Sequence, residues 1–242
     1  MKDKSLDSRL VLKNVSHNFG AVPVLKSIDL VVNPGEVVVL VGPSGCGKTT
    51  LLNLLSGHIQ PISGTIHREG IIRTVYQHDG LFPWLTVSEN ITIGLRSMME
   101  APQRENELRE LVELIHLEGF EHHYPHQLSG GMRQRVELAR VIAGDSDILL
   151  MDEPFSALDY QTRLRMRREL VRILEHRPRT VVFVTHDIEE AAQLADRVLV
   201  LSNRPATISR ELPVNALHPR DLTGIAVIGA MKAILEELGL QS

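Results

Sequence analysis

Apolar residues gather in short blocks along the chain, and these blocks predict two kinds of β-structure. Five blocks are apolar almost throughout, which is typical of strands buried on both faces of a parallel sheet. They are Glu36–Val41, Ile71–Tyr76, Asp147–Met151, Thr180–Thr185 and Arg197–Leu201. Three others are separated by Gly, Pro and Asn and predict an antiparallel layer on the N-terminal side. They are Leu10–Phe19, Val24–Val32 and Gly64–Glu69.

Between the strands, apolar residues recur at the spacing of helices. The predicted helices are Gly47–Ser56, Gln103–Leu117, Met132–Ala143, Thr162–Glu175, Ile188–Ala195 and Ile225–Leu238. We therefore predict an α/β fold with a mainly parallel sheet, an N-terminal antiparallel β subdomain and an inserted helical subdomain. The expected core is 1–85 with 145–215, the helical subdomain is 86–144, and 216–242 is a C-terminal helical segment.

Composition narrows the class of protein. The 242 residues are 43% hydrophobic, which is enough for a packed core. A formal net charge of −4 disfavours a protein that coats nucleic acid, and the single cysteine, Cys46, excludes an internal disulfide. No apolar run approaches the ~18 residues needed to cross a bilayer, and the first residues lack the apolar stretch of a signal peptide. We therefore expect a chain that is soluble by itself.

A glycine-rich turn, GPSGCGKTT, lies between a predicted strand and a predicted helix and matches the phosphate-binding P-loop. Its glycines let the backbone curl so that N–H groups face phosphate oxygens, and the helix N-terminus adds partial positive charge. Lys48 is expected to reach the β- and γ-phosphates, and Thr49 to offer its hydroxyl to Mg²⁺. The expected ATP-binding residues here are Gly42, Pro43, Ser44, Gly45, Cys46, Gly47, Lys48, Thr49 and Thr50.

Two carboxylates end the buried strand in the stretch ILLMDEP, which runs from Ile148 to Pro154. The carboxyl edge of an open α/β sheet is where such folds bind ligands. Asp152 suits a Mg²⁺ partner, and Glu153 suits a general base or a group that orients water beside the γ-phosphate. Without the P-loop, a pair of acids facing solvent would be the simpler interpretation.

A second glycine turn, HQLSGGMRQR, has no lysine at P-loop spacing, so it cannot be a second complete nucleotide site. Ser129, Gly130 and Gly131 can still supply a hydroxyl and free N–H groups from the start of a helix. A serine that only caps its own helix is the alternative.

The order of the motifs LSGGMRQR, ILLMDEP, SALD and VTHD, after Gln77 in VYQHDGLFP, resembles the ATP-binding subunit of ABC transporters over nearly the whole chain. The resemblance implies that ATP and Mg²⁺ are the cofactors and that Phe19 stacks on adenine. It also implies that His186 lies near the γ-phosphate and that Gln77 contacts Mg²⁺. Asp159 is expected at a dimer interface, or as a helix cap.

Taken together, the expected catalytic residues are Glu153, His186, Lys48 and Gln77, and the expected metal ligands are Thr49, Gln77 and Asp152. The resemblance further implies that Ser129–Gly131 completes the ATP site of a second ATPase subunit, most simply in a homodimer. Met132 stands where glutamine is commoner in this family.

The stretch DGLFPWLTVSENI places Leu81, Phe82, Pro83 and Trp84 in a predicted loop. An exposed apolar cluster of this kind marks a partner surface, although a locally folded plug would use the same residues. In the family this region meets a polytopic membrane permease, at the cytoplasmic side of the membrane. This stretch and SNRPATISREL resemble the ATPases of nitrate, sulfonate and taurine importers, which also use a solute-binding protein. The alternative is a soluble ABC-type ATPase in translation or DNA repair.

A run of arginines marks the predicted helix Thr162–Glu175. Glu169 is spaced to pair with Arg165 and Arg172 on one side of that helix. We expect the whole run to form a solvated face. Its members are Arg163, Arg165, Arg167, Arg168 and Arg172.

Overall fold

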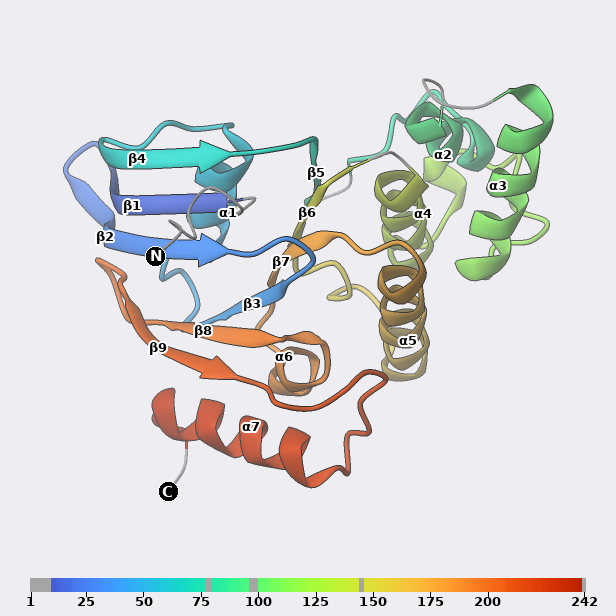
Figure 1. Ribbon diagram of the computed structural model, residues 1–242. Coiled ribbons are helices and arrows are strands. Elements are labelled where there is room, and N and C mark those ends of the chain that lie inside the picture. Colours follow the sequence, from blue (N-terminus) through green and yellow to red (C-terminus); the bar gives the residue numbers. More distant parts are fainter. Residues whose placement is uncertain (1–9, 77–79, 96–99, 144–145, 241–242) are drawn as a thin grey trace.

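The computed structural model describes residues 10–76, 80–95, 100–143 and 146–240. Two β-sheets and a group of helices make up the molecule (Figure 1). The smaller sheet has three antiparallel strands in the order β2-β1-β4, and the larger has six in the order β5-β6-β7-β3-β8-β9. Both the parallel core and the antiparallel N-terminal layer predicted from the sequence are confirmed.

The smaller sheet consists of β1 (Leu10–Phe19), β2 (Val22–Val32) and β4 (Ser63–Arg68). The larger sheet consists of β3 (Val37–Val41), β5 (Ile72–Val75), β6 (Ile148–Asp152), β7 (Thr180–Val184), β8 (Arg197–Leu201) and β9 (Ile208–Pro213). All its pairings are parallel except that of β9 with β8. The sequence did not predict β9, because this edge strand is mostly exposed and polar and so lacks an apolar block.

Seven α-helices lie in the described part of the chain. They are α1 (Lys48–Ser56), α2 (Val87–Leu95), α3 (Ala101–Leu114), α4 (Gly130–Ala143), α5 (Tyr160–His176), α6 (Ile188–Leu194) and α7 (Ile225–Glu237). The helix predicted over Gln103–Leu117 begins earlier, at Ala101, and ends earlier, at Leu114. It cannot continue through His116, whose positive φ of 51° an α-helix does not allow. None of the described helices has both the length and the apolar character needed to cross a bilayer.

The start of α2 was not located from the sequence, although a signal for it was present. Thr86 and Glu89 form a capping box: the Thr86 N–H donates to Glu89 Oε2 at 2.8 Å, and the Glu89 N–H donates to Thr86 Oγ1 at 3.3 Å. The box fixes where the connecting loop stops and the helix begins.

Side chains on opposite faces of the larger sheet enter two separate hydrophobic clusters. On β3, Val39 and Val41 pack with the cluster that includes α4, α5 and α6, whereas Val38 and Leu40 pack with α1 and the smaller sheet. The sheet is therefore covered on both faces, as its uninterrupted apolar strands predicted. This packing leaves the ends of the strands as the place where polar groups can gather.

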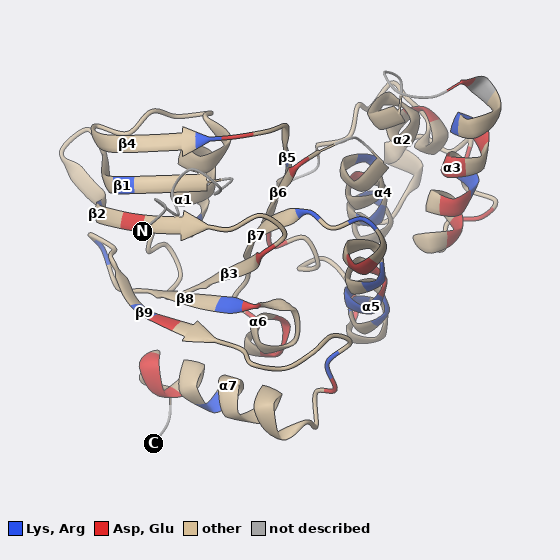
Figure 2. Cartoon of the chain, in the orientation of Figure 1, with Lys and Arg blue, Asp and Glu red and all other residues tan. Residues whose placement is uncertain are grey.

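The prediction that the arginine run is entirely solvated is wrong for two of its members. Arg165, Arg168 and Arg172 are exposed, and basic residues are visible along α5 in Figure 2. The Arg167 side chain, however, is completely buried, and that of Arg163 is largely so. Both turn toward carboxylates at the start of α6, and helical spacing within α5 gives no sign of those partners.

Candidate functional site

Strand register brings the predicted site segments to one edge of the larger sheet. Asp152 on β6 pairs with Val184 on β7, and Val184 pairs with Leu40 on β3. Because the three strands are parallel and end at the same level, the segments that follow them emerge together. These segments are the P-loop after β3, Glu153 after β6 and Thr185–Asp187 after β7.

The P-loop has the backbone that a phosphate cradle requires. Gly47 has a φ of 126°, and a Cβ there would lie 2.9 Å from Val24 Cγ1, so no other residue fits without a shift. Gly45 has a φ of 72° and is exposed. The Cys46 side chain is buried, while its N–H donates to the Pro43 carbonyl at 3.2 Å. The Cys46 side chain thus packs in the hydrophobic cluster beneath the loop and does not face the loop's exposed surface.

Lys48 is held over the loop that precedes it. Its Nζ donates to the carbonyls of Gly42 and Pro43 at 2.8 and 3.0 Å. Pro43, Ser44 and Gly45 are exposed. An ammonium group, a helix N-terminus and an open glycine-rich backbone in one place fit a polyphosphate.

Groups that suit Mg²⁺ lie beside this cradle. Thr49, in the first turn of α1, is exposed, and Thr50 is half-buried. Asp152 is buried at the end of β6, which is separated from β3 by one strand, β7. A hydroxyl and a carboxylate are hard oxygen ligands of the kind that Mg²⁺ prefers next to phosphates. Gln77, the third predicted ligand, lies outside the described residues.

Glu153 adopts a strained backbone directly after β6. Its φ is 49°, which is uncommon for a residue other than glycine and is found mostly where the surroundings enforce it. Its N–H donates to the Val184 carbonyl at 3.0 Å. Its own carbonyl accepts from Gln134 Nε2 at 3.2 Å and from Ser156 Oγ at 3.0 Å.

The Glu153 carboxylate meets His186, since Glu153 Oε2 lies 3.2 Å from His186 Nδ1. The structure thus brings the predicted base into contact with the histidine that is predicted to lie near the γ-phosphate. The Glu153 side chain is mostly buried and that of His186 mostly exposed, so the imidazole is accessible to solvent. A carboxylate beside an imidazole is suited to hold and orient water.

The turn that carries His186 is fixed by its neighbours. The Asp187 N–H donates to Thr185 Oγ1 at 2.9 Å, and Thr185 Oγ1 donates to Glu190 Oε2 at 2.6 Å. Asp187 caps α6 by accepting from the N–H groups of Glu189 and Glu190. Burial acts to raise the pKa of Asp187, but the Arg167 guanidinium and these hydrogen bonds outweigh it and hold that pKa below its usual value.

Phe19 lies at the end of β1 with 55% of its surface exposed, and its ring meets the edge of His17 at a centroid distance of 4.8 Å. That exposure shows that Phe19 is not a buried core residue. An exposed aromatic face with a fixed neighbour is suited to stack on a planar base.

The second glycine turn begins α4 at a different place. Ser129 caps the helix by accepting from the Met132 N–H at 3.2 Å, and Ser129 is itself exposed. A Cβ at Gly130 would meet only Arg133 Nη2 at 3.8 Å, whereas one at Gly131 would press on the Ala157 carbonyl at 3.2 Å. Within the described residues, no hydrogen bond joins this turn to the P-loop of the same chain.

Sequence reasoning missed three residues that shape the site. Gln134 contacts the backbone around Glu153, and Arg163 and Arg167 bind the start of α6. Gln134 lies in the motif LSGGMRQR, so the sequence showed its position, but not its hydrogen-bond partners.

Asp159 caps α5, because its side chain accepts from the Thr162 N–H at 3.0 Å. Arg163 Nη2 donates to the carbonyl of Leu158, the residue before Asp159.

The chain is similar to known proteins over most of its length. The family model described as "ABC transporter" matches residues 25–156. The aliphatic sulfonates import ATP-binding protein of Rhodococcus jostii is 43% identical over 96% of this chain and 94% of its own length. The nitrate import ATP-binding protein of Synechocystis is 44% identical over 81% of this chain and 77% of its own length.

Solved structures are similar as well. The dimeric structure of a bacterial ABC transporter cassette is 32% identical, with a TM-score of 0.77 over 86% of this chain and 100% of that one. The same cassette in a post-hydrolysis state, bound to ADP and Pi, gives a TM-score of 0.76 over the same shares.

Proposed function

The chain belongs to the ABC transporter family and is an ATP hydrolase, and we propose that it is the subunit that powers uptake of a small anion through an ABC importer. The anion we propose is nitrate, a sulfonate or taurine. The chain's similarity to two importer subunits over most of its length favours transport over a role in translation or DNA repair.

The roles of the residues follow from their places at the sheet edge. We assign the phosphates of ATP to the backbone of Gly42–Thr50 and to Lys48, and adenine to Phe19. When bound, Mg²⁺ supplies compensation for phosphate charge, and Thr49 and Asp152 are the described residues that suit it. Glu153 orients and deprotonates the attacking water, and His186, 3.2 Å from it, holds its carboxylate in place and faces the γ-phosphate.

The contact between Glu153 and His186 is the observation that carries this assignment. It joins the end of β6 to the end of β7 at the edge where the P-loop emerges. We further propose that Ser129–Gly131 binds the ATP held by the P-loop of a second copy. Two observations support this: a Cβ at Gly130 would make only an ordinary contact, with Arg133 Nη2 at 3.8 Å, so its own chain does not crowd it, and a similar cassette is dimeric.

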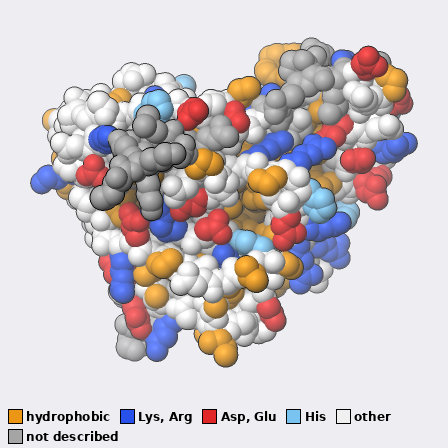
Figure 3. Space-filling view, viewed as in Figure 1, with side chains coloured by type: hydrophobic (Ala, Val, Ile, Leu, Met, Phe, Trp, Pro, Cys, Tyr) orange, Lys and Arg blue, Asp and Glu red, His pale blue; other side chains and the backbone are white. Residues whose placement is uncertain are grey.

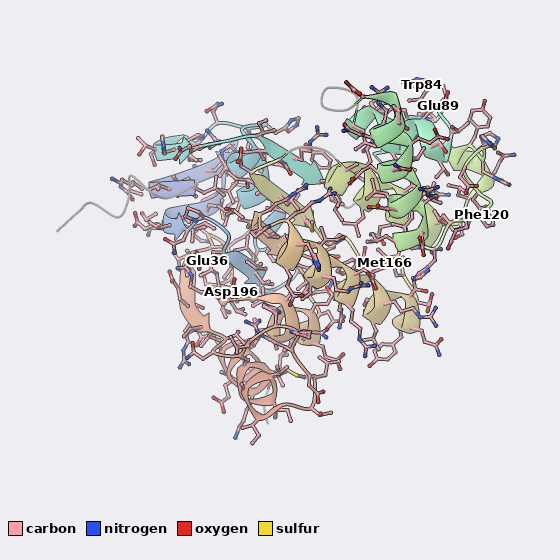
Figure 4. All side chains as sticks on the ribbon, turned by 45° about the vertical axis from the view of Figure 1, so that its right-hand side comes forward. Glu36, Trp84, Glu89, Phe120, Met166 and Asp196 are labelled. Carbon is pink, nitrogen blue, oxygen red and sulfur yellow. The ribbon has the colours of Figure 1, made fainter. Side chains whose placement is uncertain are left out.

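The loop before α2 is the surface we propose for the membrane permease. Trp84 is 69% exposed, and Figure 4 shows it with Glu89 at the outer end of the helical part of the molecule. Leu81 is buried and anchors the loop, so the partner-surface and plug interpretations each describe part of it. Hydrophobic side chains are also visible in this upper region in Figure 3.

Polar side chains hold that loop in shape. Asn90 is fully buried; its side-chain Oδ1 accepts from the Phe82 N–H, and its Nδ2 donates to three loop carbonyls. Arg140 of α4 lies 5.5 Å from the centroid of the Phe82 ring, which places a cation over its face. A loop held in this way, with Trp84 exposed, is suited to bind a permease segment. We propose that a solute-binding protein contacts the permease, and not this chain, on the far side of the membrane.

Growth of the source organism tests the transport function. We expect deletion of the gene to abolish growth on at least one of three sources: nitrate as nitrogen source, or an alkanesulfonate or taurine as sulfur source. The wild-type gene restores growth, and a Glu153→Gln copy does not. Unchanged growth and uptake of all three solutes would contradict the proposed importer.

The shared ATP site has its own test. Glu153→Gln is expected to form a stable dimer with ATP and Mg²⁺ in size-exclusion chromatography, because the nucleotide stays unhydrolysed between the subunits. Gly130→Asp in the same background is expected to stay monomeric while binding ATP. If wild-type monomers hydrolyse ATP without associating, the shared site is wrong.

A further inference from the structure

Gln134 lies at a junction between the second glycine turn and the Glu153 backbone. It is the fifth residue of α4, three residues after Gly131, and is 7% exposed. Its Nε2 donates to the Glu153 carbonyl at 3.2 Å, and its Oε1 accepts from the Ala157 N–H at 3.0 Å. One amide side chain thus spans the turn that follows β6.

A second, independent contact joins the same two segments. A Cβ built at Gly131 would lie 3.2 Å from the Ala157 carbonyl and 3.3 Å from Leu158 Cδ2. The glycine turn therefore packs directly on the turn of residues 156–158, which is already bonded to Glu153 through the Ser156 hydroxyl. A shift of the first turn of α4 cannot leave the backbone around Glu153 in place.

We propose that Gln134 is a positioning residue that couples the two ATP sites of the dimer. The inference rests on the proposed shared site. Ser129–Gly131 serves the ATP of the partner subunit, whereas Glu153 of the same chain acts on the chain's own ATP. Gln134 joins these two elements. Binding of the partner's ATP at Ser129–Gly131 therefore fixes the position of the Glu153 carboxylate, which orients water at the chain's own ATP.

The strain at Glu153 makes this coupling effective. A φ of 49° persists only while neighbouring groups enforce it, and the Gln134 amide supplies one of the hydrogen bonds at the Glu153 carbonyl. When that bond is lost, the Ser156 N–H and hydroxyl are the remaining donors to the Glu153 carbonyl within the described residues. The less constrained peptide can then shift and carry the carboxylate away from His186. A displacement of about 1 Å at a reacting group costs up to ~100-fold in rate.

The chosen substitution, Gln134→Glu, keeps the size of the side chain and replaces the donor group by a carboxylate oxygen. The new carboxylate still accepts from the Ala157 N–H, but it faces the Glu153 carbonyl with like partial charge. Gln134→Met removes both bonds with little change in volume. Gln103→Glu, at an exposed position on α3, is the matched control for the added charge.

ATP hydrolysis by the full-length chain is measured as a function of ATP concentration, with nucleotide binding and thermal unfolding measured alongside. For Gln134→Glu and Gln134→Met we expect kcat to fall by about tenfold or more. The Hill coefficient is expected to fall from above 1 in the wild type toward 1. The affinity of the monomer for ATP is expected to change less than about twofold, since no P-loop contact is altered. Gln103→Glu should match the wild type.

Two results overturn the inference. If both variants keep the wild-type Hill coefficient, whatever their kcat, Gln134 does not couple the sites. If they lose ATP affinity in step with their melting temperature, its role is only to support the fold. Failure of the shared site itself is recognised separately, because wild-type monomers would then hydrolyse ATP with a Hill coefficient of 1.

Discussion

Replacing Arg167 by methionine should destabilise the protein more than any change on the exposed side of α5. The Arg167 side chain has no exposed surface, and its Nη2 lies 2.7 Å from Asp187 Oδ2 and 2.9 Å from Glu190 Oε1. Methionine fills similar space and favours a helix, so the main effect is electrostatic. The substitution leaves two carboxylates in a largely buried place.

The magnitude follows from that burial. Removing one partner of a buried ion pair costs about 3–5 kcal/mol, because the remaining charge is left without compensation. Arg163 still contacts Asp187 at 3.2 Å, which points to the lower end of that range. For a chain of this size, each kcal/mol shifts Tm by about 2–4 °C, so we expect a loss of about 6–12 °C.

Urea unfolding followed by circular dichroism, with a thermal scan, measures the effect. Arg172→Met is the matched control, because Arg172 is exposed and pairs only with Glu169 one turn away, a contact worth up to about 0.5 kcal/mol. Adding Glu190→Gln to Arg167→Met should recover part of the loss, since it removes one of the two carboxylate charges that Arg167 compensates. A loss below about 1 kcal/mol for Arg167→Met, or no difference from Arg172→Met, would refute the reasoning.

Three other predictions address the site. Gly130→Ala should change the free energy of unfolding by less than about 0.5 kcal/mol, and Gly131→Ala should lower it by about 1–3 kcal/mol, because only the second Cβ meets the backbone of residue 157; equal losses in urea unfolding would contradict this. Asp187 has a lowered pKa in the folded state, so its contribution to stability is complete above about pH 4 and is lost as the pH falls through the folded-state value. Asp187→Asn should therefore cost stability at pH 7 and progressively less in acid, and a constant difference across that range would show that charge is not the cause. Phe19→Ala should weaken ATP binding about 2- to 10-fold in a fluorescence titration, with Phe19→Tyr near wild type, and an unchanged affinity would remove the stacking role.

Local patterns in the sequence were sufficient for most of the fold. The five apolar blocks became the parallel strands, because a strand buried on both faces must be apolar at every position. The P-loop was equally visible, since its glycines, Lys48 and Thr49 are consecutive in the chain and act through their own backbone. The edge strand β9 was not predicted, because most of its residues are exposed to solvent and can be polar, so it forms no apolar block.

Only the tertiary structure decided which distant polar groups meet. The 3.2 Å contact of Glu153 with His186 depends on the register of β6 against β7, and the motifs that contain them are separated by a helix. Arg167 looked like one more surface charge until the start of α6 placed two carboxylates against it. Gln134 gained its role in the same way, from the turn packed on its helix. Periodicity reports how each element faces water or the core, but a buried polar contact between elements depends on the relative placement of both, which no pattern within one segment records.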